Sequence, residues 1–160
     1  MNILVNVKKQ LLHTSINGTI EDEFHIATAK NGVGEKFGSE CTPRGKHIIR
    51  AKIGSGAIAN SVFVGRRLTG EVFTEELREC NPDRDWILTR ILWLSGVEVG
   101  FNRLRDVDTM RRFIYIHGCP DGDEMGIPSS HGCIKMHNSE IITLFDKVDI
   151  GTSVIIKEEE

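Results

Sequence analysis

A cysteine and two histidines lie close enough in the sequence to form a reactive site. Cys133 is preceded directly by Ser130-His131-Gly132, and His117 lies 16 residues before it. A thiol with imidazole groups nearby is the usual material of a cysteine nucleophile, because an imidazole can take the thiol proton. Gly132 lets backbone N–H groups approach a reacting carbonyl closely. The pattern predicts a Cys–His acyl-transfer site that is built on a turn and completed by backbone donors.

The size of each effect indicates what such a site must contain. A free thiol with a pKa of about 8.5 is only a few per cent thiolate at neutral pH, so complete ionisation of Cys133 would raise the rate by at most about 30-fold. A single oxyanion donor contributes about 10²–10³ in rate. We therefore expect the backbone amides around Gly132 and Cys133 to matter at least as much as the base.

Other interpretations of the same residues remain open. An isolated cysteine is often a buried structural thiol, and a histidine at the end of an apolar strand is often a hydrogen-bonded core residue. The repeated His-Gly-Cys sequence, at residues 117–119 and 131–133, also offers two imidazoles and two thiols to a tetrahedral zinc ion. Its one-residue spacing is unlike the C-x₂₋₄-C and H-x₃₋₅-H pairs of common zinc sites, which argues against the metal.

Most of the elements that must position this site are predicted to be β-strands. Apolar residues alternate with polar ones near the N-terminus, and Asn17-Gly18 is a strong hairpin signal. The strand-like segments are residues 3–7, 10–16, 24–26, 46–53, 62–64, 86–94, 96–101, 112–117 and 154–156. The run 112–117 ends at Gly118 and therefore presents His117 at the rim of a sheet.

One helix is clear from the pattern that follows Met136. Asn138 is the expected N-cap, Glu140 lies in the first turn, and the apolar residues form one stripe: Ile141, Ile142, Leu144, Phe145 and Val148. Residues 75–80 suggest a second, short helical turn within a flap-like connection, and residues 30–45 have loop composition. We predict a single mainly β domain over residues 1–160, a curved β-sandwich or open barrel-like sheet with one or two helices, ending in a solvated acidic tail.

Composition excludes several classes of protein. The 160 residues carry a net charge of −3 with no long block of either sign, which argues against a nucleic-acid or membrane-surface partner. No segment approaches the roughly 20 apolar residues that a membrane span needs. The N-terminal residues lack the basic opening and apolar stretch of a secretory signal, so a complete chain is expected to be made without a leader and a trimmed chain to have lost it.

The residues from His117 onward resemble a known family. The run His117-Gly118, followed by Gly126-x-Pro128-x-Ser130-His131-Gly132-Cys133-Ile134-Lys135-Met136, is similar to the signature of the L,D-transpeptidase (YkuD-like) catalytic domain. The helix after it, the strand at 154–156 and the run Thr42-Pro43-Arg44-Gly45-Lys46 also resemble elements of this family. The resemblance covers nearly the whole chain, and residues 55–106 are its least diagnostic part.

The resemblance implies a role for each residue of the motif. Such enzymes attack the bond after a diamino acid in a peptidoglycan tetrapeptide stem, hold the acyl group as a thioester on a cysteine and pass it to an amine. By position in the motif, Cys133 would be the nucleophile and His117 the base, with the Gly118 carbonyl orienting the imidazole. His131 and Gly132 would line the oxyanion site.

Substrate contacts and partners follow from the same resemblance. Lys135 stands where the family often has arginine and would contact a substrate carboxylate, and Tyr115, on the strand before His117, is a second candidate for substrate binding. The expected partners are peptidoglycan stem peptides or muropeptides, with carbapenem-type compounds as inhibitors. No metal or other cofactor is expected.

The chain departs from the family pattern at two points. Cys119 stands where the family commonly has Thr or Ser. It could be a small residue that replaces them, or it could form a disulfide with Cys133 that would switch activity off. The family acts mostly outside the cytoplasmic membrane, whereas these N-terminal residues show no leader pattern, so the compartment stays open. Two other functions remain: an L,D-carboxypeptidase that uses the same residues with water as acceptor, and a non-enzymatic β-rich module with a His/Cys metal site.

Overall fold

The computed structural model describes residues 1–159, and Glu160, the end of the expected acidic tail, lies outside the described residues. The strands are β1 (Asn2–Asn6), β2 (Leu11–Ile16), β3 (Thr19–His25), β4 (Gly45–Ile53), β5 (Ser61–Val64), β6 (Arg67–Val72), β7 (Ile87–Gly96), β8 (Tyr115–Gly118), β9 (Ile134–Met136) and β10 (Ser153–Lys157). The helices are α1 (Glu75–Cys80) and α2 (Asn138–Lys147), with a short 3₁₀ turn at Arg105–Val107.

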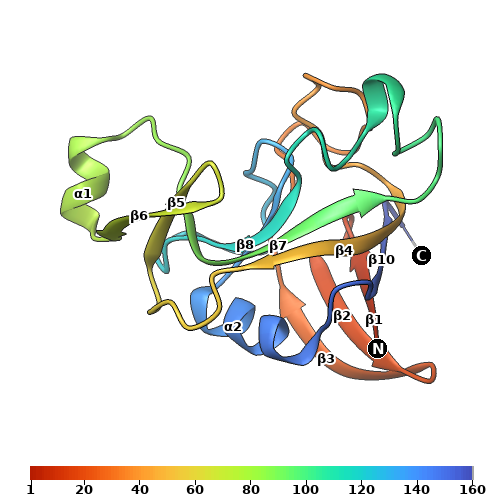
Figure 1. The fold of residues 1–160 in the computed structure, drawn as a ribbon, viewed down its shortest axis with the longest axis horizontal. Helices are drawn as coiled ribbons and strands as arrows, with labels where there is room; N and C mark the ends of the chain where they lie inside the picture. The colour runs from red at the N-terminus through yellow and green to blue at the C-terminus, as the bar shows by residue number, and fades with distance from the viewer. Residues whose placement is uncertain (160) are drawn as a thin grey trace.

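These strands form one mixed, curved sheet (Figure 1). Its order is β3-β2-β1-β10-β4-β7-β5-β6, and β8 pairs with both β7 and β9. The pairs β1–β10 and β8–β9 are parallel, whereas the others are antiparallel. An open, mainly β sheet with two helices confirms the fold class predicted from the sequence. No helix in residues 1–159 has the length and apolar character needed to cross a membrane.

The main core lies between α2 and the sheet. The apolar stripe predicted for this helix is buried at Ile141, Leu144, Phe145 and Val148, and the helix packs on β7 and β8. Each such side chain contributes about 1.5–3 kcal/mol when it leaves water. The helix therefore holds the strand that carries His117 against the centre of the sheet.

The N-cap predicted for α2 is wrong by one residue. His137 is the N-cap, and its side chain makes no capping hydrogen bond, whereas Asn138 is already helical. The side chain of Asn138 is 3% exposed and is bonded instead to residues around the end of β8. A tertiary contact has therefore displaced the local capping role that its residue type favours.

A small lobe of β5, β6 and α1 lies at one end of the molecule, on the left in Figure 1. It has its own apolar cluster: Val62, Trp86 and Leu88, with Phe73 and Leu77 packed against them. Thr74 starts α1, since its hydroxyl accepts the N–H of Leu77 at 3.1 Å. The segment interpreted as a flap therefore has a defined structure.

Two strand predictions require correction. The strand expected over residues 96–101 is wrong, because β7 ends at Gly96 and a turn follows in which Asn102 Oδ1 accepts the N–H of Glu98 at 3.0 Å. The strand expected over residues 112–117 begins only at Tyr115. Phe113 has a φ of +57° and lies in a turn, with its N–H bonded to the Met110 carbonyl at 3.1 Å.

A buried histidine in β4 makes stability depend on pH. His47 is 1% exposed; its Nδ1 donates to the Gly45 carbonyl at 3.1 Å and its Nε2 accepts from the Thr109 hydroxyl at 2.9 Å. Burial lowers its pKa from 6.5 to about 4. Below pH 6.5 the unfolded chain therefore binds a proton that the folded chain refuses, so stability falls as the pH decreases.

We expect the free energy of unfolding to fall by about 2 to 3 kcal/mol between about pH 7 and pH 4.5 on account of His47. Urea unfolding of the wild type and of His47→Gln at both pH values measures this. The variant is expected to lose less stability on acidification than the wild type. Equal pH dependence in the two proteins would show that His47 is not the group responsible.

Candidate active site

Two parallel strands bring His117 and Cys133 to the same place. His117 is the third residue of β8, and Cys133 directly precedes β9, whose register sets Lys135 opposite His117. Just before the first paired residues of β8 and β9, the Tyr115 N–H donates to Cys133 Sγ at 3.3 Å. Residues 119–133 therefore form an excursion whose two ends meet at the sheet.

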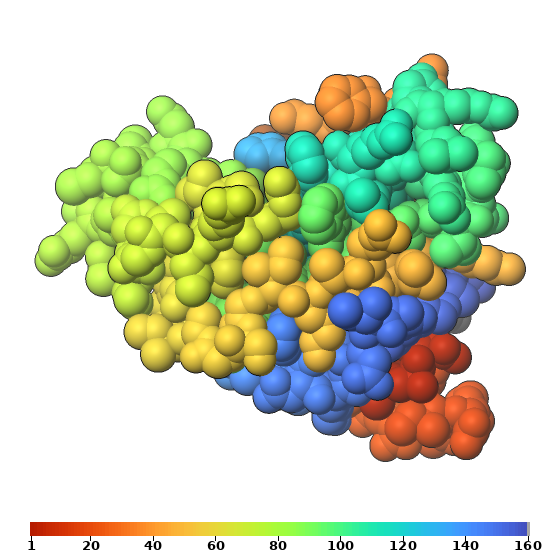
Figure 2. Space-filling view, viewed as in Figure 1, coloured from red at the N-terminus to blue at the C-terminus, as the bar shows by residue number. Residues whose placement is uncertain are grey.

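Both side chains line one pocket of about 390 Å³. Its other walls come from the β5–β6 turn, from the start of β7 with the segment before it, and from the start of β8 with the segment before it: Gly65, Arg66, Asp85, Ile87, Arg112, Phe113, Ile114 and Tyr115, with Ser130 and His131. A neighbouring pocket of about 450 Å³ shares Asp85, Ser130 and His131 with the first. Figure 2 shows the lobe that borders these pockets, in yellow-green, standing away from the teal and orange segments.

The imidazole of His117 is held in one tautomer. The side chain is 1% exposed, and its Nδ1 lies 2.7 Å from the Gly118 carbonyl oxygen. Because a carbonyl only accepts, Nδ1 carries the proton and Nε2 keeps its lone pair. Burial is the largest influence on the His117 pKa and lowers it, so the ring is neutral at neutral pH. This arrangement leaves Nε2 able to accept a proton.

Gly118, whose carbonyl orients the ring, lies where no larger residue fits. A Cβ atom on Gly118 would lie 2.6 Å from the Leu88 carbonyl oxygen and 3.1 Å from Thr89 Cβ. The absence of a side chain therefore lets β8 approach β7 closely. The carbonyl that holds Nδ1 of His117 belongs to this closely packed peptide.

Cys133 is a protonated thiol in this environment. It is half-buried, and its Sγ also donates to the Phe113 carbonyl at 3.4 Å. Burial raises the Cys133 pKa to about 12, and the nearby Asp85 carboxylate acts in the same direction, although the Tyr115 N–H and Arg112 oppose it. A thiol ionised in the free protein, as the sequence suggested, is therefore not favoured. Attack by this sulfur would require its proton to pass to a base.

The turn before Cys133 is fixed by hydroxyl groups. Gly132 has a φ of +133°, a conformation that favours glycine, and its carbonyl accepts from Thr42 Oγ1 at 2.9 Å. Its N–H donates to Ser130 Oγ at 3.2 Å, and the Ser130 hydroxyl donates to the Cys133 carbonyl. The Gly132 amide is thus engaged with Ser130, while His131 is exposed and borders both pockets.

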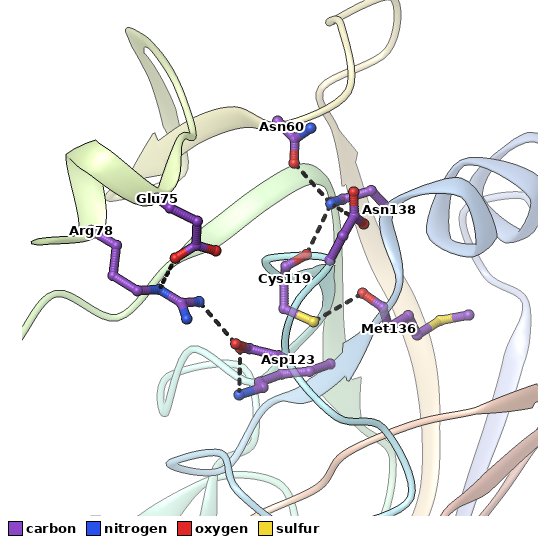
Figure 3. Close-up of polar contacts among 9 residues, drawn as sticks. Asn60, Glu75, Arg78, Cys119, Asp123, Met136 and Asn138 are labelled. Atoms are coloured by element: carbon purple, nitrogen blue, oxygen red, sulfur yellow. Dashed lines mark hydrogen bonds and ion pairs between the residues drawn. The ribbon is translucent and has the colours of Figure 1, made fainter. Parts of the chain in front are cut away.

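The two candidate substrate contacts lie in different pockets. Tyr115 lines the pocket of Cys133, and its hydroxyl accepts from Arg66 at 2.9 Å. Lys135 lines the neighbouring pocket instead, and its ammonium lies 3.6 Å from Asp123 Oδ2. Asp123 also accepts from Arg78 of α1 at 2.8 Å. Figure 3 shows the ion pair between Arg78 and Asp123, which links the lobe to the segment after β8.

Cys119 has the surroundings of a structural thiol. It is 0% exposed, its Sγ donates to the Met136 carbonyl at 3.3 Å, and burial raises its pKa to about 12. The four cysteines are free, so the Cys119–Cys133 disulfide is not present. In residues 1–159, no three His, Cys, Asp or Glu side chains are grouped so that they could hold a metal ion.

Several pocket residues could not be found from sequence motifs. Asp85, Arg66 and Arg112 belong to no motif that marks them as site residues, although Arg112 opens the strand-like run 112–117, and only the folded sheet brings them to Cys133. Arg112 also donates to the Cys41 carbonyl at 2.6 Å and so ties residues 34–41 to the pocket wall. Next to residues 34–41, the run that begins at Thr42 is the part whose sequence resembles an element of the family.

The comparison with protein families agrees with this geometry. A family model described as the L,D-transpeptidase catalytic domain (YkuD) matches residues 2–156. The chain belongs to this family. Among curated L,D-transpeptidase relatives, "Putative L,D-transpeptidase YqjB" of Bacillus subtilis (strain 168) is 24% identical over 157 residues, which are 98% of this chain and 71% of that protein.

Solved L,D-transpeptidase structures share the fold. L,D-transpeptidase 3 from Mycobacterium tuberculosis, in complex with a faropenem-derived adduct, has a TM-score of 0.60 and 18% identity over 98% of this chain. The L,D-transpeptidase LdtMt1 in complex with imipenem has a TM-score of 0.55 and 14% identity over 97% of this chain. The present chain spans only 59% and 57% of those two structures.

Proposed function

We propose that this chain is an L,D-transpeptidase that acts on peptidoglycan tetrapeptide stems through a thioester on Cys133. His117 is the general base in this proposal, and the Gly118 carbonyl orients it. The observation that carries the proposal is that Cys133 and a neutral His117 of fixed tautomer line the same pocket. The sulfur would attack as its proton passes to Nε2 of His117, because the thiol is protonated beforehand.

The first half of the reaction forms the thioester. Sγ of Cys133 bonds to the carbonyl carbon of the diamino acid, and the carbonyl oxygen becomes negative. The N–H groups of His131 and Cys133 would serve this oxygen, because that of Gly132 is bonded to Ser130, and each well-placed donor contributes about 10²–10³ in rate. The C–N bond then breaks, and the leaving D-Ala amine takes the proton from His117.

The second half transfers the acyl group to an amine. The amine nitrogen bonds to the thioester carbon, the C–S bond breaks, and a proton returns to the Cys133 sulfur through His117. Tyr115 and Lys135 would contact the donor stem and the residues beside it. With water in place of the amine, the same steps would make the chain an L,D-carboxypeptidase.

A product assay separates these outcomes. The chain is incubated with a disaccharide tetrapeptide, with and without a second muropeptide that carries a free amine, and the products are identified by mass spectrometry. We expect release of D-Ala and a crosslinked dimer whose yield rises with the amine. Release of D-Ala that yields only the tripeptide, even with the amine in excess, would favour the carboxypeptidase. An intact tetrapeptide would refute both.

A further inference from the structure

The side chain of Asn138 connects α2 with the end of β8. It is the first residue of the helix, and its Nδ2 lies 2.9 Å from the Cys119 carbonyl oxygen. The same nitrogen lies 2.9 Å from the side-chain oxygens of Asn60 and Asp121. Figure 3 shows Asn138 reaching toward Cys119 and Asn60 from the helix. An amide with two hydrogens serves three acceptors here, so one hydrogen is shared.

Thr89 supports Asn138 from the opposite side. Its hydroxyl donates to Asn138 Oδ1 and accepts the N–H of Asn60 at 3.0 Å. Thr89 has a φ of +73°, which is an outlier for a β-branched residue, and it lies where the β7–β8 register shifts between Leu88 and Ile91. Backbone strain of this kind persists only where the surroundings hold it, and it is often found at functional sites.

These contacts surround the peptide that orients His117. The Cys119 N–H donates to the Met136 carbonyl at 3.1 Å, while the Cys119 carbonyl accepts from Asn138. The neighbouring Gly118 has no room for a side chain beside Asn138 and Thr89. Because the Gly118 carbonyl accepts from His117 Nδ1, any rotation of this segment would move the acceptor away from the ring.

We propose that Asn138, supported by Thr89, is a positioning residue for His117. It acts by holding the Gly118–Cys119 segment so that the Gly118 carbonyl keeps the proton on Nδ1 and the lone pair on Nε2. Nothing in the reaction itself touches Asn138. The inference rests on the proposed function only for its kinetic consequence, because the tautomer of His117 can be observed without any substrate.

The test uses Asn138→Ala, with two readouts. Long-range ¹H–¹⁵N NMR spectra report which nitrogen of His117 is protonated, and intact mass spectrometry reports the rate at which imipenem acylates the protein. We expect the Nδ1-protonated fraction to fall and the acylation rate to decrease by about 10- to 100-fold, the usual cost of a small misplacement of a reacting group. Thr89→Val should act in the same direction, and Thr89→Ser, which keeps the hydroxyl, should restore part of both.

A matched control separates positioning from stability. Val148→Ala removes a buried side chain at the other end of the same helix region, so it should lower the melting temperature while the His117 tautomer stays unchanged. A wild-type tautomer and acylation rate in Asn138→Ala would overturn the proposal, as would a loss that matches Val148→Ala without any tautomer change. Failure of imipenem to acylate the wild type would count against the proposed function alone, because the tautomer measurement still decides the role of Asn138.

Discussion

Replacing Cys133 with alanine is expected to abolish the covalent adduct that imipenem forms with this chain. Cys133 is the thiol that shares a pocket with His117, so its sulfur is the atom placed to attack a β-lactam carbonyl. The raised pKa of Cys133 does not prevent this, since the neutral His117 can accept the proton during attack. Intact mass spectrometry after incubation with imipenem measures the adduct directly.

The other cysteines supply matched controls for that experiment. Cys119→Ala removes a thiol only 14 residues earlier in the chain, but that thiol is buried and bonded to the Met136 carbonyl. Cys80→Ala removes the exposed thiol of α1. Both variants should keep the adduct, because neither thiol lines the pocket of His117. An adduct that persists in Cys133→Ala, or disappears in Cys119→Ala, would move the nucleophile to another residue.

Strands that bury one face were predictable because burial imposes a period on the sequence. The alternation near the N-terminus matches β1, in which Ile3 and Val5 are buried. By contrast, β6 is exposed along nearly its whole length, so no alternation marks it. β9 has only three residues, and its existence depends on its pairing with β8. The apolar residues after Gly96 suggested a strand, but a side-chain contact of Asn102 closes a turn there.

The local part of the site was predictable, and its surroundings were not. His117 and Cys133 share a short stretch of sequence with the glycines that such chemistry needs, and the fold brings both to one pocket. The charges that act on them come from elsewhere: Asp85 precedes β7 and Arg112 follows it. Their placement depends on the order of strands in the sheet. The uncharged state of the Cys133 thiol depends on burial, which no spacing of residues reveals.

The second large effect is expected for His117→Ala, which should slow acylation by imipenem by about 10²–10⁴-fold while Cys133 stays in place. The reason is that Cys133, whose pKa is raised to about 12, has almost no thiolate of its own at neutral pH and needs a base at the moment of attack. His25→Ala is the matched control, because this exposed histidine on β3 lies outside the pocket. A rate in His117→Ala within about threefold of the wild type would mean that another group takes the proton.

The pH dependence of acylation distinguishes a base from a residue that merely packs. His117 must be neutral to act, and burial lowers its pKa below the usual 6.5, so the wild-type rate should hold steady from neutral pH down past that value and fall only in more acidic solution. On the alkaline side the wild-type rate should stay level up to about pH 9. The Cys133 thiol remains protonated and His117 remains neutral over this range, so the reacting pair does not change its protonation state. In His117→Ala the level region and its acidic bend should vanish, since no imidazole remains to be protonated, and the residual rate should instead rise steadily with pH over the whole range, as the thiolate fraction of Cys133 does. Stopped assays between about pH 5 and 9, with folding checked by circular dichroism at each pH, measure both limbs. A variant profile that keeps the wild-type level region and its acidic bend would assign that bend to a group other than His117.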